Sequence, residues 1–202
     1  MNKNDYDEAT FCDAVSQQLD LCYDRLKKQM RDNNGLFLSH LLLPGLPPRV
    51  GILSIISQIV SDYQAGTRDA SDAFTELLDN IVIYFTLANV GQEKPEMTDA
   101  QRELYKLDFF EAANDVLDSL YFLLKKKNQS YGAAVMRAPV LTPQLPPTVA
   151  VCVRVSDKLG RLFSGGRIEG ENFEDTLRDL AGYIVIFEIL ASETRATDGA
   201  GD

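Results

Sequence analysis

The feature that most constrains this chain is an internal repeat of an acidic, amphipathic segment. Residues 171–187 read ENFEDTLRDLAGYIVIF and align without gaps with residues 72–88, DAFTELLDNIVIYFTLA. At that offset Asp179 falls opposite Asn80. Apolar residues three and four positions apart, as in these segments, are typical of a helix that buries one face. Two further pairs of stretches repeat at nearly the same offset: 13–28 with 111–126, and 46–66 with 145–165.

The repeat predicts two helical units of one ancestral type. We place the first unit at 1–92 and the second at 93–192, and we expect a disordered tail at 193–202. Fusing two copies is one way to build the interface of a homodimer into a single chain. We therefore expect the two units to superpose about a pseudo-twofold axis. The sequence also leaves open whether two copies of the tandem-repeat chain form a homodimer.

Each unit is expected to contain three helices. Thr98 and Gln101 have the spacing of a capping box, which marks the start of a long first helix. The second helix begins in both units at Leu-Pro-Pro, because proline suits the first turn of a helix. In the second unit this segment is rich in β-branched residues, but its charged residues recur at a helical spacing rather than alternating. With third helices expected at about 70–90 and 171–192, the fold class is all-α.

Composition and charge exclude several classes of function. The formal net charge of −10 disfavours a nucleic-acid partner, which requires a basic surface. No apolar run reaches membrane-spanning length and MNKNDYDEAT has no apolar signal region, so we expect a cytoplasmic protein without a membrane partner. The single histidine, His40, excludes a His-rich metal site, and a Ser-His-Asp triad has no support in the sequence. Cys12, Cys22 and Cys152 lack zinc-site spacing and are expected to be reduced thiols.

Carboxylates at helical spacing are the first candidate site. Glu171, Asp175 and Asp179 stand four residues apart, so they line one stripe of a helix. Glu111 and Asp115 do the same on the expected first helix of the second unit. Like charges at this spacing repel, and carboxylate oxygens on facing helices suit Mg²⁺. A solvated acidic face is the alternative interpretation of each stripe.

Basic and aromatic residues of the second unit form the second candidate site. Lys127 is expected at the end of the first helix, where a cation suits the helix dipole. A turn that follows it can present an amine, a phenol and backbone N–H groups to one ligand. Arg154, Asp157, Lys158 and Arg161 share one helix face, where they can pair with each other or contact phosphate oxygens. The candidate substrate-binding residues are Lys127, Asn128, Tyr131, Gly132, Arg154, Lys158 and Arg161.

Three motifs follow one another in the second unit. They are K-N-x-x-Y-G from Lys127, R-x-x-D-K-x-x-R from Arg154, and E-x-x-x-D-T-x-x-D-x-x-x-Y from Glu171. Together, over about 105–192, they resemble the phage and bacterial family called nucleotide modification-associated domain 1. That family is placed near the MazG-like all-α nucleoside triphosphate pyrophosphohydrolases. The resemblance implies two MazG-like helical units, the first of them degenerate.

The resemblance also implies a magnesium-dependent enzyme that converts a nucleoside triphosphate, a deoxynucleotide in particular, to the monophosphate and pyrophosphate. Glu171, Asp175 and Asp179 would then be catalytic and would hold Mg²⁺. Glu111 or Asp115 would complete the metal site from the facing helix. The lysines and arginines would neutralise phosphate charge, and Tyr131 would contact the nucleoside. A phage protein of this kind would work in the host cytoplasm.

A second function stays open, namely a nucleotide-binding protein of the same fold that sequesters a nucleotide or a nucleotide signal without turnover. The family carries Asp directly before Tyr-Gly, where this chain has Ser130. In the first unit Ile55, Gln58, Ile59 and Asp62 stand opposite the charged residues of the second motif. We therefore expect one nucleotide per chain, bound by the second unit. A structural or protein-interaction role is the third alternative.

Overall fold

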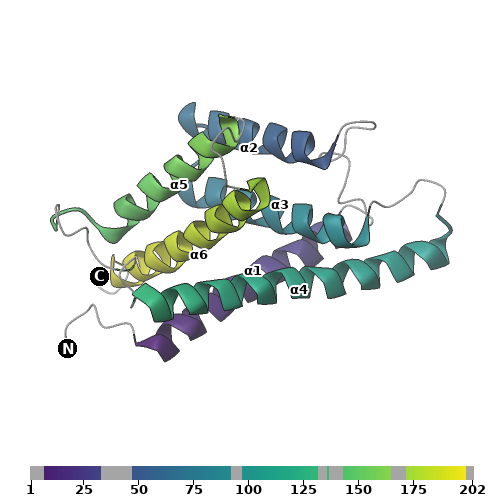
Figure 1. Ribbon diagram of the computed structural model, residues 1–202, viewed down its shortest axis with the longest axis horizontal. Coiled ribbons are helices and arrows are strands. Elements are labelled where there is room, and N and C mark those ends of the chain that lie inside the picture. Colours follow the sequence, from purple (N-terminus) through teal and green to yellow (C-terminus); the bar gives the residue numbers. More distant parts are fainter. Residues whose placement is uncertain are drawn as a thin grey trace. The chain divides into compact units, whose positions relative to one another are not determined.

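The computed structural model describes residues 7–32, 47–91, 97–131, 136, 143–164 and 172–198. These residues form six α-helices and no strand, so the predicted all-α class is confirmed (Figure 1). The helices are α1 Glu8–Asp32, α2 Pro48–Gln64, α3 Ala70–Val90, α4 Asp99–Tyr131, α5 Pro147–Phe163 and α6 Phe173–Asp198.

The predicted helix starts are confirmed, and local chemistry explains them. The Thr98 N–H donates to Gln101 Oε1 at 2.8 Å and the Gln101 N–H donates to Thr98 Oγ1 at 3.3 Å, which is the predicted capping box before α4. Helix α2 begins at Pro48 and α5 at Pro147, each directly after the first proline of its pair. The β-branched segment of the second repeat is thus a helix, as its charge spacing predicts.

Two helix ends lie further along the chain than the sequence suggests. We expect Lys127 to end its helix, but α4 continues to Tyr131, and the Ser130 hydroxyl donates to the backbone oxygen of Lys126 at 3.0 Å. Helix α6 continues past the expected end at 192 to Asp198. Because a run of polar residues carries no stop signal of its own, such ends are hard to place from sequence.

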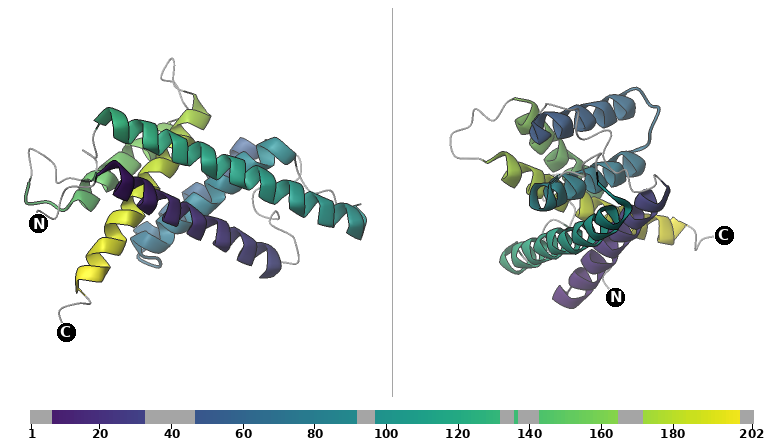
Figure 2. Two further views of the ribbon diagram at one scale, coloured as in Figure 1. Left: turned by 90° about the horizontal axis from the view of Figure 1, so that it is seen from below. Right: turned by 90° about the vertical axis from the view of Figure 1, so that its right-hand side faces the viewer.

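The chain divides into two compact units. We call Met1–Leu19 with Leu120–Asp202 the terminal unit, and Asp20–Ser119 the central unit. Their boundaries fall inside α1 and α4, each of which is one unbroken helix (Figure 2). These boundaries differ from the repeat boundary at 92 and 93, because each repeat contributes residues to both units. The superposition of the repeats about a pseudo-twofold axis stays a prediction.

Each unit is built around the third helix of a repeat. In the central unit α3 packs against α2, and every residue from Ile81 to Leu87 is buried. In the terminal unit α6 packs against α5, and every residue from Ile184 to Leu190 is buried. A helix segment buried all round is a core element. None of the helices in the described ranges is both long and apolar enough to cross a bilayer.

Candidate functional site

Three of the predicted site residues meet in the terminal unit, each from a different helix. Lys127 lies near the end of α4, Lys158 on α5 and Asp179 on α6. Lys158 Nζ lies 2.9 Å from Asp179 Oδ2, and Lys127 Nζ contacts Asp179 Oδ1. We call these three residues the lysine–aspartate cluster. Each carboxylate oxygen of Asp179 is therefore in contact with one ammonium group.

The position of Lys158 in the cluster follows from the buried face of α5. Val151, Val155, Lys158 and Leu162 are the buried residues at intervals of three and four, so Lys158 replaces an apolar residue on that face. Its side chain is 11% exposed. A buried ammonium group requires an opposite charge, which Asp179 supplies.

The other residues of the predicted basic face are exposed. Arg154, Asp157 and Arg161 are exposed, and Arg154 Nη1 lies 3.9 Å from Asp157 Oδ2. Lys158 differs from these three in being buried, so it lies where the predicted polar face meets the buried face of α5. An exposed ion pair of this kind adds little to stability.

The electrostatics of Asp179 are set by two opposing effects. Burial raises the pKa of its carboxyl, but hydrogen bonds from Lys127 and Lys158 and their charges outweigh burial and hold the pKa below its usual value. Asp179 is therefore ionised at every pH near neutrality. It contributes a fixed negative charge between two positive ones.

Among the described residues, the predicted carboxylates do not form a metal-binding group. Asp175 has a side chain that is 67% exposed and pairs with Arg178 at 3.2 Å. Glu111 and Asp115 are exposed on α4 and belong to the central unit, whereas Asp175 and Asp179 belong to the terminal unit. Within the ranges that the structure describes, no three or more His, Cys, Asp or Glu residues lie together as a metal site would require.

Several predicted residues cannot be placed. Glu171, Gly132 and His40 lie outside the described residues, and so does the side chain of Tyr131. Asn128 is described and half-buried, one residue beyond Lys127 on α4.

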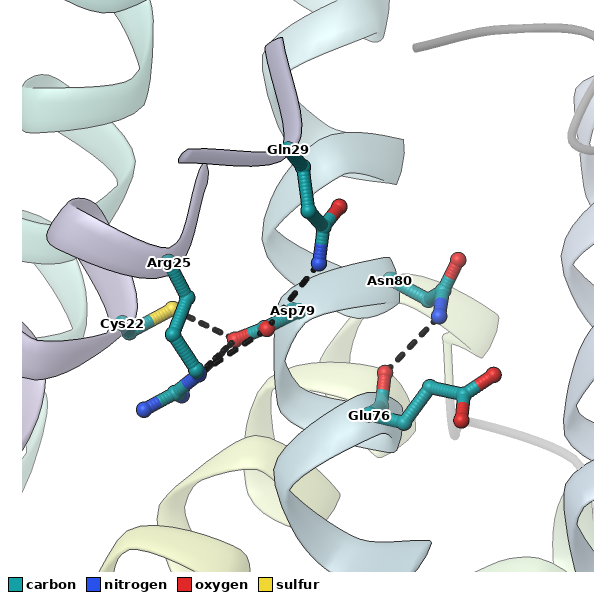
Figure 3. A network of polar contacts seen from close by, with 6 residues as sticks. All are labelled: Cys22, Arg25, Gln29, Glu76, Asp79 and Asn80. Carbon is teal, nitrogen blue, oxygen red and sulfur yellow. Dashed lines mark hydrogen bonds and ion pairs between the residues drawn. The ribbon is translucent and has the colours of Figure 1, made fainter. Parts of the chain in front are cut away.

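A second acidic site, in the central unit, was missed by the sequence analysis. Asp79 lies on α3 with its side chain 3% exposed, and it accepts hydrogen bonds from three residues of α1 (Figure 3). Arg25 Nη2 donates to Oδ1 at 2.7 Å and its Nε to Oδ2 at 3.0 Å, while the Cys22 thiol donates to Oδ1 at 3.2 Å. Gln29 Nε2 donates to Oδ2 at 3.4 Å. We call these four residues the arginine–aspartate network.

One signal in the sequence could have revealed this network. Asp79 is a lone acid between Leu77, Leu78 and the apolar run that starts at Ile81. A charge inside an apolar segment is buried and must be paired. The partner of Asp79 could not be predicted from the sequence, because Arg25 lies 54 residues earlier in the chain, on another helix.

The two acidic sites show how the repeats have diverged. In the repeat alignment Gln29 stands opposite Lys127, and both reach an acid on the third helix of their repeat. The position of Lys158 is taken by Ile59, which is buried. The position of Asp179 is taken by Asn80, whose amide donates to the backbone oxygen of Glu76 at 2.8 Å (Figure 3). The first repeat thus lacks both lysines and the carboxylate of the lysine–aspartate cluster.

No protein-family model matches the sequence, and no match was found among the curated proteins or among the solved structures.

Proposed function

We propose that this protein binds a nucleotide and that the lysine–aspartate cluster receives its phosphate groups. The supporting observation is that Lys127 and Lys158, which belong to two different motifs of the sequence, converge on one point from two helices. Two ammonium groups that meet at one half-exposed position can each donate to a phosphate oxygen. A protein with a net charge of −10 needs such a local concentration of positive charge to bind a polyphosphate.

The activity proposed for this site is the one that the resemblance implies, the magnesium-dependent conversion of a nucleoside triphosphate to the monophosphate and pyrophosphate. The same proposal includes the finer fold assignment, in which two MazG-like units are related by a pseudo-twofold axis. The equal lengths of α2 and α5, 17 residues each, and their starts at equivalent prolines support that assignment. A cytoplasmic location, expected from the sequence, belongs to the same proposal, and a phage origin follows from the resemblance alone.

The second candidate, nucleotide binding without turnover, is favoured by the state of the carboxylates. A metal ion at Asp179 would face the ammonium groups of Lys127 and Lys158, and Asp175 is engaged with Arg178. As they lie, the described carboxylates do not fit a Mg²⁺ site. Ser130, where the family has Asp, points the same way.

A screen of canonical and modified nucleoside triphosphates with Mg²⁺ tests both candidates at once. Chromatography detects monophosphate and pyrophosphate, and equilibrium dialysis detects nucleotide that is bound but not consumed. Pyrophosphate formation that falls by orders of magnitude in Asp175→Asn supports the enzyme. Tight binding without product supports the binding protein.

The lysines are tested by a matched pair of substitutions on adjacent positions of α4. Lys127→Ala should weaken nucleotide binding by about tenfold or more, since a charge-assisted hydrogen bond contributes roughly 1.5–3 kcal/mol. Lys126→Ala removes the same charge from an exposed neighbour and should leave affinity within about twofold. Equal affinities of the two variants would contradict the proposed function.

A further inference from the structure

We infer that Asp179 is an internal competitor for the phosphate position, so that an anion binds only by displacing its carboxylate from the two lysines. The inference rests on the proposed function, because it describes how that site is kept closed when no nucleotide is bound. It differs from the role that the sequence suggests for Asp179, which is to hold Mg²⁺.

The contacts of Asp179 support a competing role. Oδ1 contacts Lys127 Nζ and Oδ2 lies 2.9 Å from Lys158 Nζ, so the carboxylate bridges the two ammonium groups as a phosphate would. A phosphate placed between the same groups would occupy the same space. Carboxylate and phosphate therefore exclude each other.

The two ion pairs of the cluster differ in their exposure to solvent. The side chains of Lys127 and Asp179 are 41% and 29% exposed, whereas that of Lys158 is 11% exposed. The Lys127–Asp179 contact is thus the part of the cluster that solvent and a dissolved anion can reach. Separating the exposed Lys127–Asp179 pair costs little, so exchange begins there. The entering anion then supplies the opposite charge that buried Lys158 requires.

The central unit provides the contrast. Asp79 is 3% exposed and is held by Arg25 through several hydrogen bonds, all from side chains of one helix (Figure 3). An anion cannot take its place without entering the core. The arginine–aspartate network is therefore structural, and the competing role belongs to Asp179 alone of these two acids.

Charge predicts the direction of the effect. With Asp179 ionised, the cluster carries one net positive charge, and without it the cluster carries two. Asp179→Asn keeps the shape of the side chain and removes the competing charge. A polyanion should therefore bind this variant more tightly, whereas loss of a metal ligand would weaken magnesium-dependent binding.

The test measures the binding of inorganic tripolyphosphate in EDTA, so that no divalent metal contributes. Asp179→Asn should bind about tenfold more tightly than the unchanged chain, and adding Lys158→Met should abolish that gain. Glu193→Gln is the control, because it removes one negative charge from an exposed position on the same helix. Its affinity should stay within about twofold of the unchanged chain.

A second neutral variant, Asp179→Ser, serves if Asp179→Asn does not fold, and thermal unfolding decides which variant is used. Tripolyphosphate affinity of the Asp179 variant equal to that of Glu193→Gln overturns the inference. If Lys127→Ala still weakens nucleotide binding in that case, the proposed function stands. If neither lysine substitution weakens nucleotide binding, the proposed function is contradicted as well.

Discussion

Asp79 and Asp179 both accept hydrogen bonds from basic side chains, but their pKa values are shifted in opposite directions. Burial raises the pKa of Asp79, and the hydrogen bonds and charge of Arg25 oppose it without overcoming it. At Asp179 burial also raises the pKa, but there the two lysines prevail and the pKa is lowered. The difference follows from exposure, since Asp79 is almost wholly removed from water.

Loss of the Asp79 carboxyl oxygens should destabilise the protein. Asp79→Ala removes the acceptors of the hydrogen bonds from Cys22, Arg25 and Gln29 and should lower the free energy of unfolding by about 2–4 kcal/mol. Asp108→Asn, at an exposed position of α4 in the same unit, should change it by less than about 0.5 kcal/mol. Urea denaturation compares the two variants. Equal midpoints would show that the network contributes nothing.

The two acids should also give stability opposite dependences on pH. The pKa of Asp179 is lowered, so its contribution is present above the usual value of 3.8 and is lost as the pH falls through the lowered pKa. The pKa of Asp79 is raised, so its ionised form costs stability at neutral pH. That cost is relieved as the pH falls through the raised pKa toward 3.8.

Melting temperatures across an acid pH series measure both effects. The stability of the unchanged chain relative to Asp79→Asn should grow as the pH falls from neutral toward 3.8. Its stability relative to Asp179→Asn should shrink only below that value. If the stability of the unchanged chain relative to Asp79→Asn instead shrinks over this pH range, the pKa of Asp79 is not raised.

The site was predictable from sequence as a set of residue types but not as a set of contacts. Lys127, Lys158 and Asp179 were all expected at one site, and they do meet. Their pairing was not predicted, since helical spacing reports which residues share a face and not what lies opposite. Lys158 shows this most directly, because spacing groups it with Arg154 and burial separates them.

At the scale of the elements, starts were easier to predict than ends. Prolines and the Thr98–Gln101 capping box act through local sequence, which a reader of the sequence can see. The ends of α4 and α6 carry no such local signal, so the sequence could not place them.

Two helical glycines test the packing of the elements in the terminal unit. A Cβ at Gly160 in α5 would meet nothing within 4 Å, whereas one at Gly182 in α6 would lie 3.2 Å from Leu124 Cδ2 of α4. Gly160→Ala should raise the free energy of unfolding by about 0.5–1 kcal/mol, because alanine favours the helix. Gly182→Ala should stabilise the protein less than Gly160→Ala does, because buried Leu124 must shift to admit the added methyl group. Chemical denaturation that ranks Gly182→Ala as the more stable variant would contradict the close packing of α6 against α4.

At the scale of the whole molecule, the sequence repeat and the compact units divide the chain differently. The repeat is a property of the sequence alone, whereas each compact unit contains residues of both repeats. A boundary inside a continuous helix leaves no mark in composition or turn residues, so sequence alone could not place it. The asymmetry between the copies was visible in the sequence, since Ile59 and Asn80 replace Lys158 and Asp179.

The central claim is that one nucleotide binds per chain and that Lys127 and Lys158 hold it. Isothermal titration calorimetry with a nucleoside triphosphate selected by the screen measures stoichiometry and affinity together. We predict one nucleotide per chain, no detectable binding after Lys127→Met with Lys158→Met, and unchanged binding after Lys126→Met. Two equivalent nucleotides per chain, or binding that survives the loss of both lysines in a folded protein, would contradict the account.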